Sequence, residues 1–113
     1  MEPSTAARDV LAERQQQMEA ERWTPEHDDD HDTGEIAQAA ACYASPQPIY
    51  VKETDYEEGM TGCVRFDGAW PWADQWWKPK DRRRDLVRAG ALILAEIERL
   101  DRAKAAQGKA GAV

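Results

Sequence analysis

The chain has 113 residues, which is enough for a single domain with a small core. Its formal net charge of −7 at pH 7 excludes a generally basic surface for nucleic acid, so duplex nucleic acid is not an expected partner. No apolar run approaches the roughly 18 residues that a membrane span requires, and the first residues lack a signal-peptide pattern. We therefore expect a cytoplasmic protein that does not bind membranes, with Cys42 and Cys63 as reduced thiols.

The first predicted helix spans residues 6–22. Its apolar side chains recur at helical spacing and are expected to form a narrow buried stripe: Ala7, Val10, Leu11 and Met18. Trp23 and Thr24 follow, and Pro25 disfavours helical geometry at the residue before it. We therefore expect the helix to end there, before a polar run of His and Asp residues.

A second, Ala-rich helix is predicted over residues 35–44. Asp32 and Glu35 have the spacing of a capping box, in which each side chain accepts from the other residue's backbone N–H. One side of this helix carries the residues expected to be buried: Ile36, Ala39, Ala40 and Tyr43. Within the inserted residues 47–67, β-branched and aromatic residues predict a small β-hairpin formed by residues 49–52 and 63–66.

The longest periodic run predicts a last helix that begins after Asp81. Its apolar stripe has 4-3-4-3 spacing, widened by Val87 and Leu94: Leu86, Gly90, Ile93, Ile97 and Leu100. We expect Gly90 to pack closely against the alanines of the second helix. The same spacing would also support a homodimer or larger oligomer, so the oligomeric state stays open. Residues 1–5 and about 104–113 are expected to fray.

These elements predict one mainly α domain over residues 1–113. It is a small bundle of two amphipathic helices and a short Ala-rich helix, with an inserted β-hairpin and a Trp- and Pro-rich segment that crosses the helix ends. Pro71 and Pro79 prevent that segment from being a regular helix or a central strand.

The Trp-rich segment is the first candidate site, because four of the five tryptophans lie within eight residues. Tryptophan faces stack on planar rings, and arginines at a helix N-terminus bind phosphate. The segment and the basic residues after it predict a pocket for a nucleotide-like phosphorylated ligand, formed by Trp70, Trp72, Trp76, Trp77, Lys80, Arg82, Arg83 and Arg84. The alternative is that the tryptophans form the core and the arginines a solvated face.

Acidic residues provide two further candidates. A metal site would use imidazole and carboxylate ligands from the polar run, of which His27, Asp28, His31 and Asp32 are weak candidates. A catalytic site for Mg²⁺ or Mn²⁺ would use six carboxylates: Asp28, Asp29, Asp32, Glu35, Glu98 and Asp101. The alternative for both sets is a solvated helix surface that needs no cofactor.

The sequence resembles a family of small phage and prophage proteins. The resemblance covers residues 12–29, the segment from Ala39 to Ala44, and the motifs WPW, WWKP and RRDLVRAGALI between Trp70 and Ile93. It implies a phage–host setting, in the cytoplasm of an infected or lysogenic bacterium. A weaker likeness is to the ryanodine-receptor repeat domain, with Arg22 in place of the usual glycine before Trp23. In bacteria that domain is associated with conflict systems and nucleotide-like ligands.

A second weak likeness is to the all-α MazG-type nucleotide pyrophosphohydrolases. Glu98 and Asp101 match the ExxD motif of those enzymes, but the chain lacks their EExxE motif. Three functions therefore remain open. The first is a non-catalytic phage protein that sequesters a nucleotide-like host signal, and the second is a Mg²⁺-dependent nucleotide hydrolase. The third is an acidic inhibitor of a host nuclease or defence protein, suggested by the acidic runs at residues 26–35 and 53–58.

Overall fold

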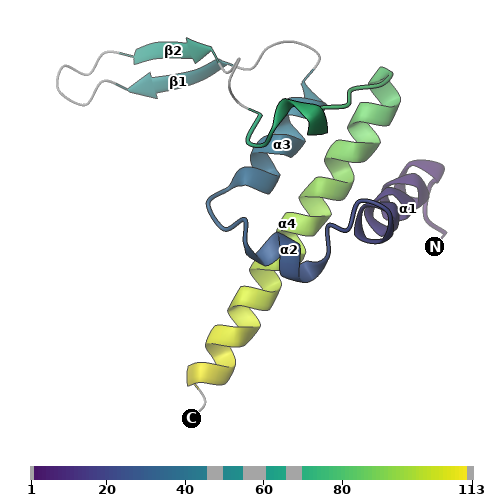
Figure 1. Cartoon of the computed structure of the whole chain (residues 1–113), viewed down its shortest axis with the longest axis vertical. Helices are drawn as coiled ribbons and strands as arrows, with labels where there is room; N and C mark the ends of the chain where they lie inside the picture. Colours follow the sequence, from purple (N-terminus) through teal and green to yellow (C-terminus); the bar gives the residue numbers. More distant parts are fainter. Residues whose placement is uncertain (1, 46–49, 55–60, 66–69, 112–113) are drawn as a thin grey trace.

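The fold is a small, mainly helical bundle, as predicted. The computed structural model describes residues 2–45, 50–54, 61–65 and 70–111. In these ranges the chain forms four α-helices, two strands and one 3₁₀ turn: α1 (Thr5–Glu19), α2 (Pro25–Asp29), α3 (Glu35–Ala44), β1 (Tyr50–Thr54), β2 (Thr61–Arg65), η2 (Asp74–Trp76) and α4 (Arg82–Gly111). Figure 1 shows α4 as the longest element, with α1 and α3 on its two sides and α2 across it.

Helix α1 buries polar residues, so the predicted apolar stripe on this helix is wrong. Ser4 caps the helix by accepting a hydrogen bond from the Ala7 backbone N–H at 3.1 Å. Leu11 is 57% exposed, whereas the buried residues of the helix are Glu13, Arg14 and Gln17. Glu13 and Arg14 can be buried because α2 and α4 supply charged groups opposite them. Ion pairs therefore form part of the α1–α4 interface.

The residues after α1 form a tight turn and then a short helix. Arg22 has φ of 59°, in the left-handed region that non-glycine residues seldom adopt. Thr24 caps α2 by accepting from the His27 backbone N–H at 3.3 Å, and Pro25 is the first helical residue. Part of the polar run is thus helical, which places His27 and Asp28 on an ordered scaffold.

Helix α3 has the predicted bounds and the predicted buried face, but a different start. The predicted capping box is wrong, because the residue at the N-cap is Gly34 with φ of 90°. This left-handed conformation is one that glycine adopts without steric cost. Glu35 instead accepts hydrogen bonds from the Thr33 hydroxyl and from its backbone N–H, the latter at 2.7 Å. Asp32 is left exposed.

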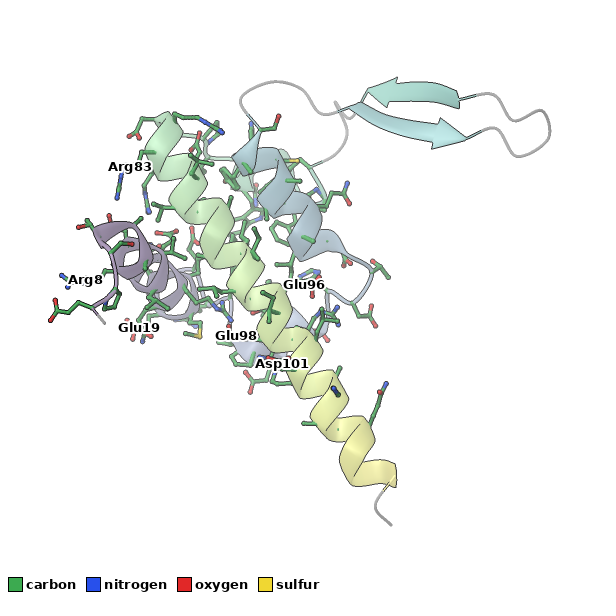
Figure 2. All side chains as sticks on the ribbon, turned by 180° about the vertical axis from the view of Figure 1, so that it is seen from behind. Arg8, Glu19, Arg83, Glu96, Glu98 and Asp101 are labelled. Atoms are coloured by element: carbon green, nitrogen blue, oxygen red, sulfur yellow. The ribbon has the colours of Figure 1, made fainter. Side chains whose placement is uncertain are left out.

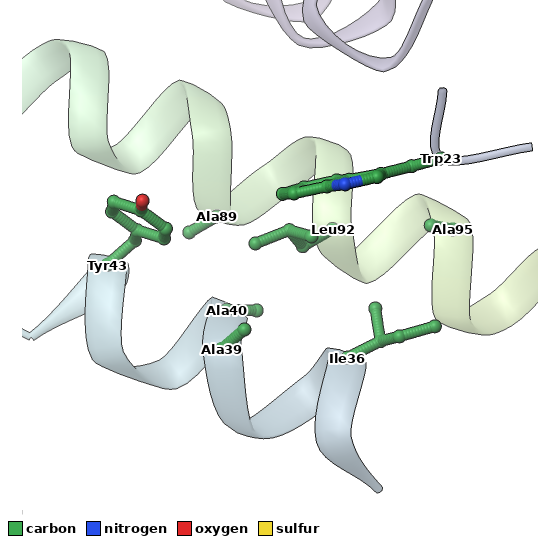
Figure 3. Close-up of a cluster of buried hydrophobic side chains, with 8 residues drawn as sticks. All are labelled: Trp23, Ile36, Ala39, Ala40, Tyr43, Ala89, Leu92 and Ala95. Carbon is green, nitrogen blue, oxygen red and sulfur yellow. The ribbon is translucent and has the colours of Figure 1, made fainter. Parts of the chain in front are cut away.

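The core lies between α3 and α4. Figure 3 shows small side chains of both helices facing each other, with Trp23 over the top of the cluster. Its members are Trp23, Ile36, Ala39, Ala40, Tyr43, Ala89, Leu92 and Ala95. The alanines allow a close approach of the two helices. Gly90 does not take part in this contact, contrary to the prediction: a Cβ added there would lie 3.1 Å from a Val10 methyl of α1.

Helix α4 buries Val87 of its predicted apolar stripe but presents most of the stripe's large residues to solvent. Asp81 caps the helix as predicted, accepting from the Arg84 backbone N–H at 2.9 Å. However, Leu86, Ile93, Ile97 and Leu100 each expose between 44% and 53% of their surface. The expected fraying from about residue 104 is also not seen, because α4 continues to Gly111 through residues that favour helix, such as Ala and Lys. The lower end of α4 projects beyond the other helices (Figure 1).

The predicted β-hairpin is present. Strands β1 and β2 pair antiparallel, with Tyr50 opposite Arg65 and Thr54 opposite Thr61. The strands are shifted by one or two residues from their predicted bounds, as is common for short elements. In the described part of the chain, no helix has both the length and the apolar character needed to cross a membrane.

Candidate ligand-binding site

Tyr43 fixes the Trp-rich segment to the core. Its hydroxyl donates to the Trp76 carbonyl at 3.3 Å and accepts from the Lys78 backbone N–H at 3.1 Å. Arg88 of α4 also donates to this oxygen, at 3.2 Å, and its guanidinium lies over the Tyr43 ring. One side chain of α3 therefore joins the irregular segment to α4.

Aromatic rings continue from Tyr43 through the segment. Trp70 contacts Tyr43, Trp72 and Trp77, with ring centroids 5.5, 5.3 and 5.0 Å away. The Trp70 indole N–H donates to the Ala73 carbonyl at 3.0 Å, which closes the turn before η2. The predicted tryptophan cluster is therefore present, and it is both structural and partly exposed.

Four rings form a second cluster next to the first: Trp23, His27, His31 and Trp72. Trp72 lies 5.5 Å from Trp23 and 5.4 Å from His31 between ring centroids. The two histidines lie 4.7 Å apart, and Trp23 stacks on His27 with an interplanar angle of 8°. The Nδ1 atoms of His27 and His31 lie 3.2 and 3.1 Å from carboxylate oxygens of Asp28 and Glu35, which fixes both imidazoles.

These rings border a cavity of about 450 Å³, which we call the aromatic cavity. Its volume falls within the range of small-molecule sites, roughly 300–1,000 Å³. The lining residues come from the α1–α2 turn, α2, the loop before α3, and the Trp-rich segment: Glu21, Arg22, Trp23, His27, His31, Trp72, Ala73 and Trp76. Four residues that the sequence analysis named as candidates for different sites are thus brought to one cavity: the predicted ligand-binding residues Trp72 and Trp76, and the weak metal-ligand candidates His27 and His31.

Glu21 supplies a carboxylate to the aromatic cavity. Burial raises the pKa of this carboxyl above its ordinary value, although nearby Arg88 opposes the shift. Its Oε1 accepts from Arg88 at 3.4 Å, whereas Oε2 is buried and has no hydrogen-bond partner among the described residues. The indole Nε1 of Trp72 is buried and unpartnered in the same sense. Two residues that line the cavity therefore each have a buried polar atom that lacks a hydrogen-bond partner among the described residues.

Sequence reasoning did not identify Glu21 and Arg22 as site residues. The signal for Arg22 lies in its backbone, which the sequence does not show. Its φ of 59° is the backbone conformation that glycine favours. Strained non-glycine residues of this kind occur preferentially at functional sites.

The basic residues predicted to bind phosphate do not line the aromatic cavity. Arg83 pairs with Asp9 at 2.8 Å and Arg84 pairs with Glu13 at 2.6 Å, both on α1. These four residues line a separate cleft of about 350 Å³ between α1 and α4. Lys80 and Arg82 are exposed. The sequence thus predicted one combined site, whereas the structure places the two halves of that site apart.

The six candidate catalytic carboxylates are not arranged around a metal position. Arg14 bonds both Asp28 at 2.8 Å and Glu98 at 2.9 Å, and Arg102 bonds Asp29 at 2.8 Å. A divalent cation would have to displace these guanidinium groups. Asp32 and Asp101 are exposed, and Glu35 bonds Thr33. Over the described ranges, no group of three or more His, Cys, Asp or Glu side chains is placed to hold a metal ion.

The aromatic cavity is therefore the site with the clearest binding chemistry: flat apolar walls, one carboxylate and an exposed arginine at its edge. No protein-family model, curated protein or solved structure matches this chain. The binding chemistry of the cavity is therefore inferred from its residues alone.

Proposed function

We propose that the protein is a non-catalytic binding protein that holds the planar ring of a nucleotide-like ligand in the aromatic cavity. The observation that carries the proposal is the cavity of about 450 Å³ with Trp23, Trp72 and Trp76 in its walls. Stacking on aromatic side chains contributes about 1–3 kcal/mol per base and tolerates any base, because every base has a flat face. The cavity volume fits one base with its sugar.

Polar groups at the cavity favour a ring that carries an amino group. Glu21 lines the cavity, and carboxylates accept hydrogen bonds from exocyclic amino groups of bases. Exposed Arg22 and Lys78 supply positive charge for a phosphate outside the cavity. The Lys78 ammonium lies 5.5 Å from the centre of the Trp76 ring, close to the cavity wall. We therefore expect the base inside and the phosphate at the edge.

Binding is favoured over hydrolysis because the acidic residues are already paired. Arg14 and Arg102 hold three of the six carboxylates that a Mg²⁺-dependent hydrolase would use. The proposal therefore requires no metal cofactor. The resemblance to small phage proteins supplies the setting: in an infected bacterium, such binding would sequester a nucleotide-like host signal. That setting is part of the proposal and is tested separately from the cavity.

Trp76 and Trp77 provide a matched test. They are adjacent and similarly exposed, at 41% and 39%, but of the two only Trp76 lines the aromatic cavity. We expect adenosine, guanosine or cytidine monophosphate to bind, measured by titration calorimetry and quenching of tryptophan fluorescence. Trp76→Ala should weaken binding about 5- to 150-fold, from the loss of one stacking face. Trp77→Ala should leave the affinity unchanged. Equal losses in both variants would contradict the cavity as the site.

A second variant separates the aromatic cavity from the position predicted from the sequence. Arg83→Ala combined with Arg84→Ala removes the basic residues of the α1–α4 cleft. We expect this double variant to retain nucleotide affinity and to lose stability, because both arginines pair with α1. Loss of binding with unchanged stability would place the phosphate at the start of α4 instead.

A further inference from the structure

The rings that line the aromatic cavity lie in more than one plane. Trp23 and His27 are nearly parallel, with an angle of 8° between their planes, whereas Trp72 is inclined by 52° to Trp23 and by 60° to His31. Trp76 adds a further ring, which is 41% exposed. Aromatic rings that are inclined to one another around one space form an aromatic cage, the arrangement that binds organic cations through the negative faces of the rings.

One ring of this cage already attracts a cation of the chain itself. The Lys78 ammonium lies 5.5 Å from the centre of the Trp76 ring, within the roughly 6 Å over which a cation interacts with an aromatic face. Tyr43, which anchors the same segment, has the Arg88 guanidinium 5.3 Å from its ring centre. Because Lys78 is exposed, its ammonium can move into solvent when a ligand enters. The rings of this region therefore favour positive charge.

Glu21 gives the cavity a negative charge that the chain compensates only in part. Its ion pair with Arg88 has a length of 3.4 Å, compared with 2.6 Å for the pair of Arg84 with Glu13. Arg88 is also shared, because it contacts the Tyr43 hydroxyl at 3.2 Å and Glu13 at 3.5 Å. Burial raises the pKa of Glu21 in spite of Arg88, so folding disfavours the ionised carboxylate. A cation inside the cavity would stabilise it.

The positive side chains at the cavity are exposed and lie at its edge. Arg22 is an exposed lining residue, and Lys78 is exposed and is not among the lining residues. Both histidines of the cavity have a carboxylate oxygen beside Nδ1, at 3.2 and 3.1 Å, so a proton on either ring lies next to a negative charge. The cavity therefore suits a ligand that carries a positive charge inside and a negative group at the edge.

We propose that the aromatic cavity prefers a nucleotide whose ring is positively charged, as in a base methylated at a ring nitrogen. This inference rests on the proposed function and names the class of nucleotide that the site would select. The charged ring would stack on tryptophan, its positive charge would meet the aromatic faces and the Glu21 carboxylate, and its phosphate would lie near Arg22 and Lys78. Such a base also keeps its exocyclic amino group as a donor for Glu21.

Three nucleotides test the role of the charge. Adenosine monophosphate has an uncharged ring, whereas the ring of 1-methyladenosine monophosphate is positively charged at neutral pH. Adenosine monophosphate that carries the methyl group on its exocyclic amino group instead has the same added group and no charge. By titration calorimetry at neutral pH, we expect the 1-methyl nucleotide to bind about 5- to 30-fold more tightly than either uncharged nucleotide, because a cation interacts strongly with aromatic faces away from water.

The outcomes separate this inference from the proposed function. Equal affinity for the three nucleotides, or an equal gain from both methyl positions, would overturn the preference for a cation and leave nucleotide binding in place. If none of the three binds, both proposals are wrong. A preference for the 1-methyl nucleotide alone would support both.

Two pairs of matched variants assign the preference to the cavity. Glu21→Gln and Glu19→Gln each remove one carboxylate near the end of α1, but Glu19 is exposed on that helix and does not line the cavity (Figure 2). Glu21→Gln should weaken binding of the 1-methyl nucleotide severalfold more than binding of adenosine monophosphate, whereas Glu19→Gln should keep the wild-type ratio of the two affinities. Leucine at position 76 keeps an apolar contact but has no aromatic face, so Trp76→Leu should also lower this ratio and Trp77→Leu should not.

Far-UV circular dichroism shows whether each variant is folded. The ratio of affinities compares two nucleotides on the same variant, so a loss of folded protein does not change it. An unchanged ratio in Glu21→Gln or in Trp76→Leu would overturn the assignment of the charge preference to the aromatic cavity.

Discussion

Arg14 joins three of the four helices in the described chain. From α1 it bonds Asp28 of α2 at 2.8 Å, Glu98 of α4 at 2.9 Å and the Trp23 carbonyl at 3.3 Å. The side chains of Arg14 and Asp28 are 5% and 3% exposed, so this is a buried ion pair. Removing one partner of such a pair leaves an uncompensated charge in a region of low dielectric.

We predict that Arg14→Met destabilises the fold by about 3–5 kcal/mol, the usual cost of leaving one buried charge alone. Urea unfolding followed by circular dichroism measures this. Arg8→Met is the control, because Arg8 of the same helix pairs with Glu2 before the helix, and this largely exposed pair should contribute less than about 1 kcal/mol. Asp28→Asn added to Arg14→Met should recover part of the loss. If Arg14→Met and Arg8→Met had equal effects, the pair would have no structural role.

The roles of these residues were not predictable from sequence spacing. Arg14 lies 14 residues from Asp28 and 84 from Glu98, and a charged residue on a polar helix is normally assigned to solvent. Asp28 and Glu98 were considered as metal or catalytic ligands because of their types. The structure shows that an arginine occupies the position between them. Residue type alone did not distinguish a carboxylate that binds a metal from one that pairs with an arginine.

Among the elements, the bounds and buried face of α3 were predicted correctly, whereas its capping and the packing of α1 and α4 were not. Helix α3 has a single apolar side, so its period identifies the buried face. Helix α4 has two apolar sides, one with large residues and one with alanines such as Ala89, Ala91 and Ala95. Hydrophobic periodicity gives most weight to large side chains, and it therefore predicted that the outer face of α4 is the buried one. The inner face has small residues because α3 approaches closely.

Gly90 allows a prediction about the packing of α1 on α4. Glycine in a helix interior costs about 1 kcal/mol relative to alanine. A Cβ at Gly90, however, would lie 3.1 and 3.2 Å from the two Val10 methyl carbons. We predict that Gly90→Ala stabilises the chain by about 0.5–1 kcal/mol more in a Val10→Ala background than in the wild type. Chemical denaturation of the four chains of this double-mutant cycle measures the difference.

One outcome of this double-mutant cycle would contradict the prediction. Additive effects within about 0.3 kcal/mol would mean that Val10 and Gly90 do not restrict each other. Gly108→Ala serves as the control, because nothing lies within 4 Å of a Cβ at that position. Its effect should therefore be the same with Val10 or Ala at position 10. A dependence of Gly108→Ala on residue 10 would indicate a change in the whole helix rather than local packing.

In the whole molecule, the candidate site is formed by segments that are far apart in the sequence. The tryptophan cluster was predictable. Two prolines keep this short segment out of regular helix and sheet, so its four tryptophans are expected to lie on one surface. Its combination with Arg83 and Arg84 was not, because their direction depends on acidic residues of α1 about 70 residues earlier. The position of Glu21 at the aromatic cavity depends on the turn at Arg22.

The stability of the whole chain should respond to pH in opposite ways at two carboxyls. Burial raises the pKa of Glu21 above 4.5, so the folded state binds this proton more tightly than the unfolded state. The resulting stability is present below pH 4.5 and is lost as the pH rises through the folded pKa. For Glu35, hydrogen bonds from Thr33 lower the pKa from 4.5 to about 2. Its contribution is present above pH 4.5 and is lost as the pH falls toward 2.

We predict that Glu21→Gln, measured by urea unfolding at fixed protein concentration, becomes more favourable relative to the wild type as the pH rises from 4.5 to neutrality. Glutamine stays uncharged, so the variant avoids the cost of ionising a buried carboxyl, and any constant effect of the amide cancels between pH values. Glu35→Gln is the opposite control: it should be destabilising at neutral pH, with an effect that fades below pH 4.5. A stability difference for Glu21→Gln that is constant with pH would mean that Arg88 fully compensates the buried charge. If ionised Glu21 lowers stability at neutral pH, folding alone does not favour this carboxylate. That behaviour is expected of a residue whose role is to bind a ligand.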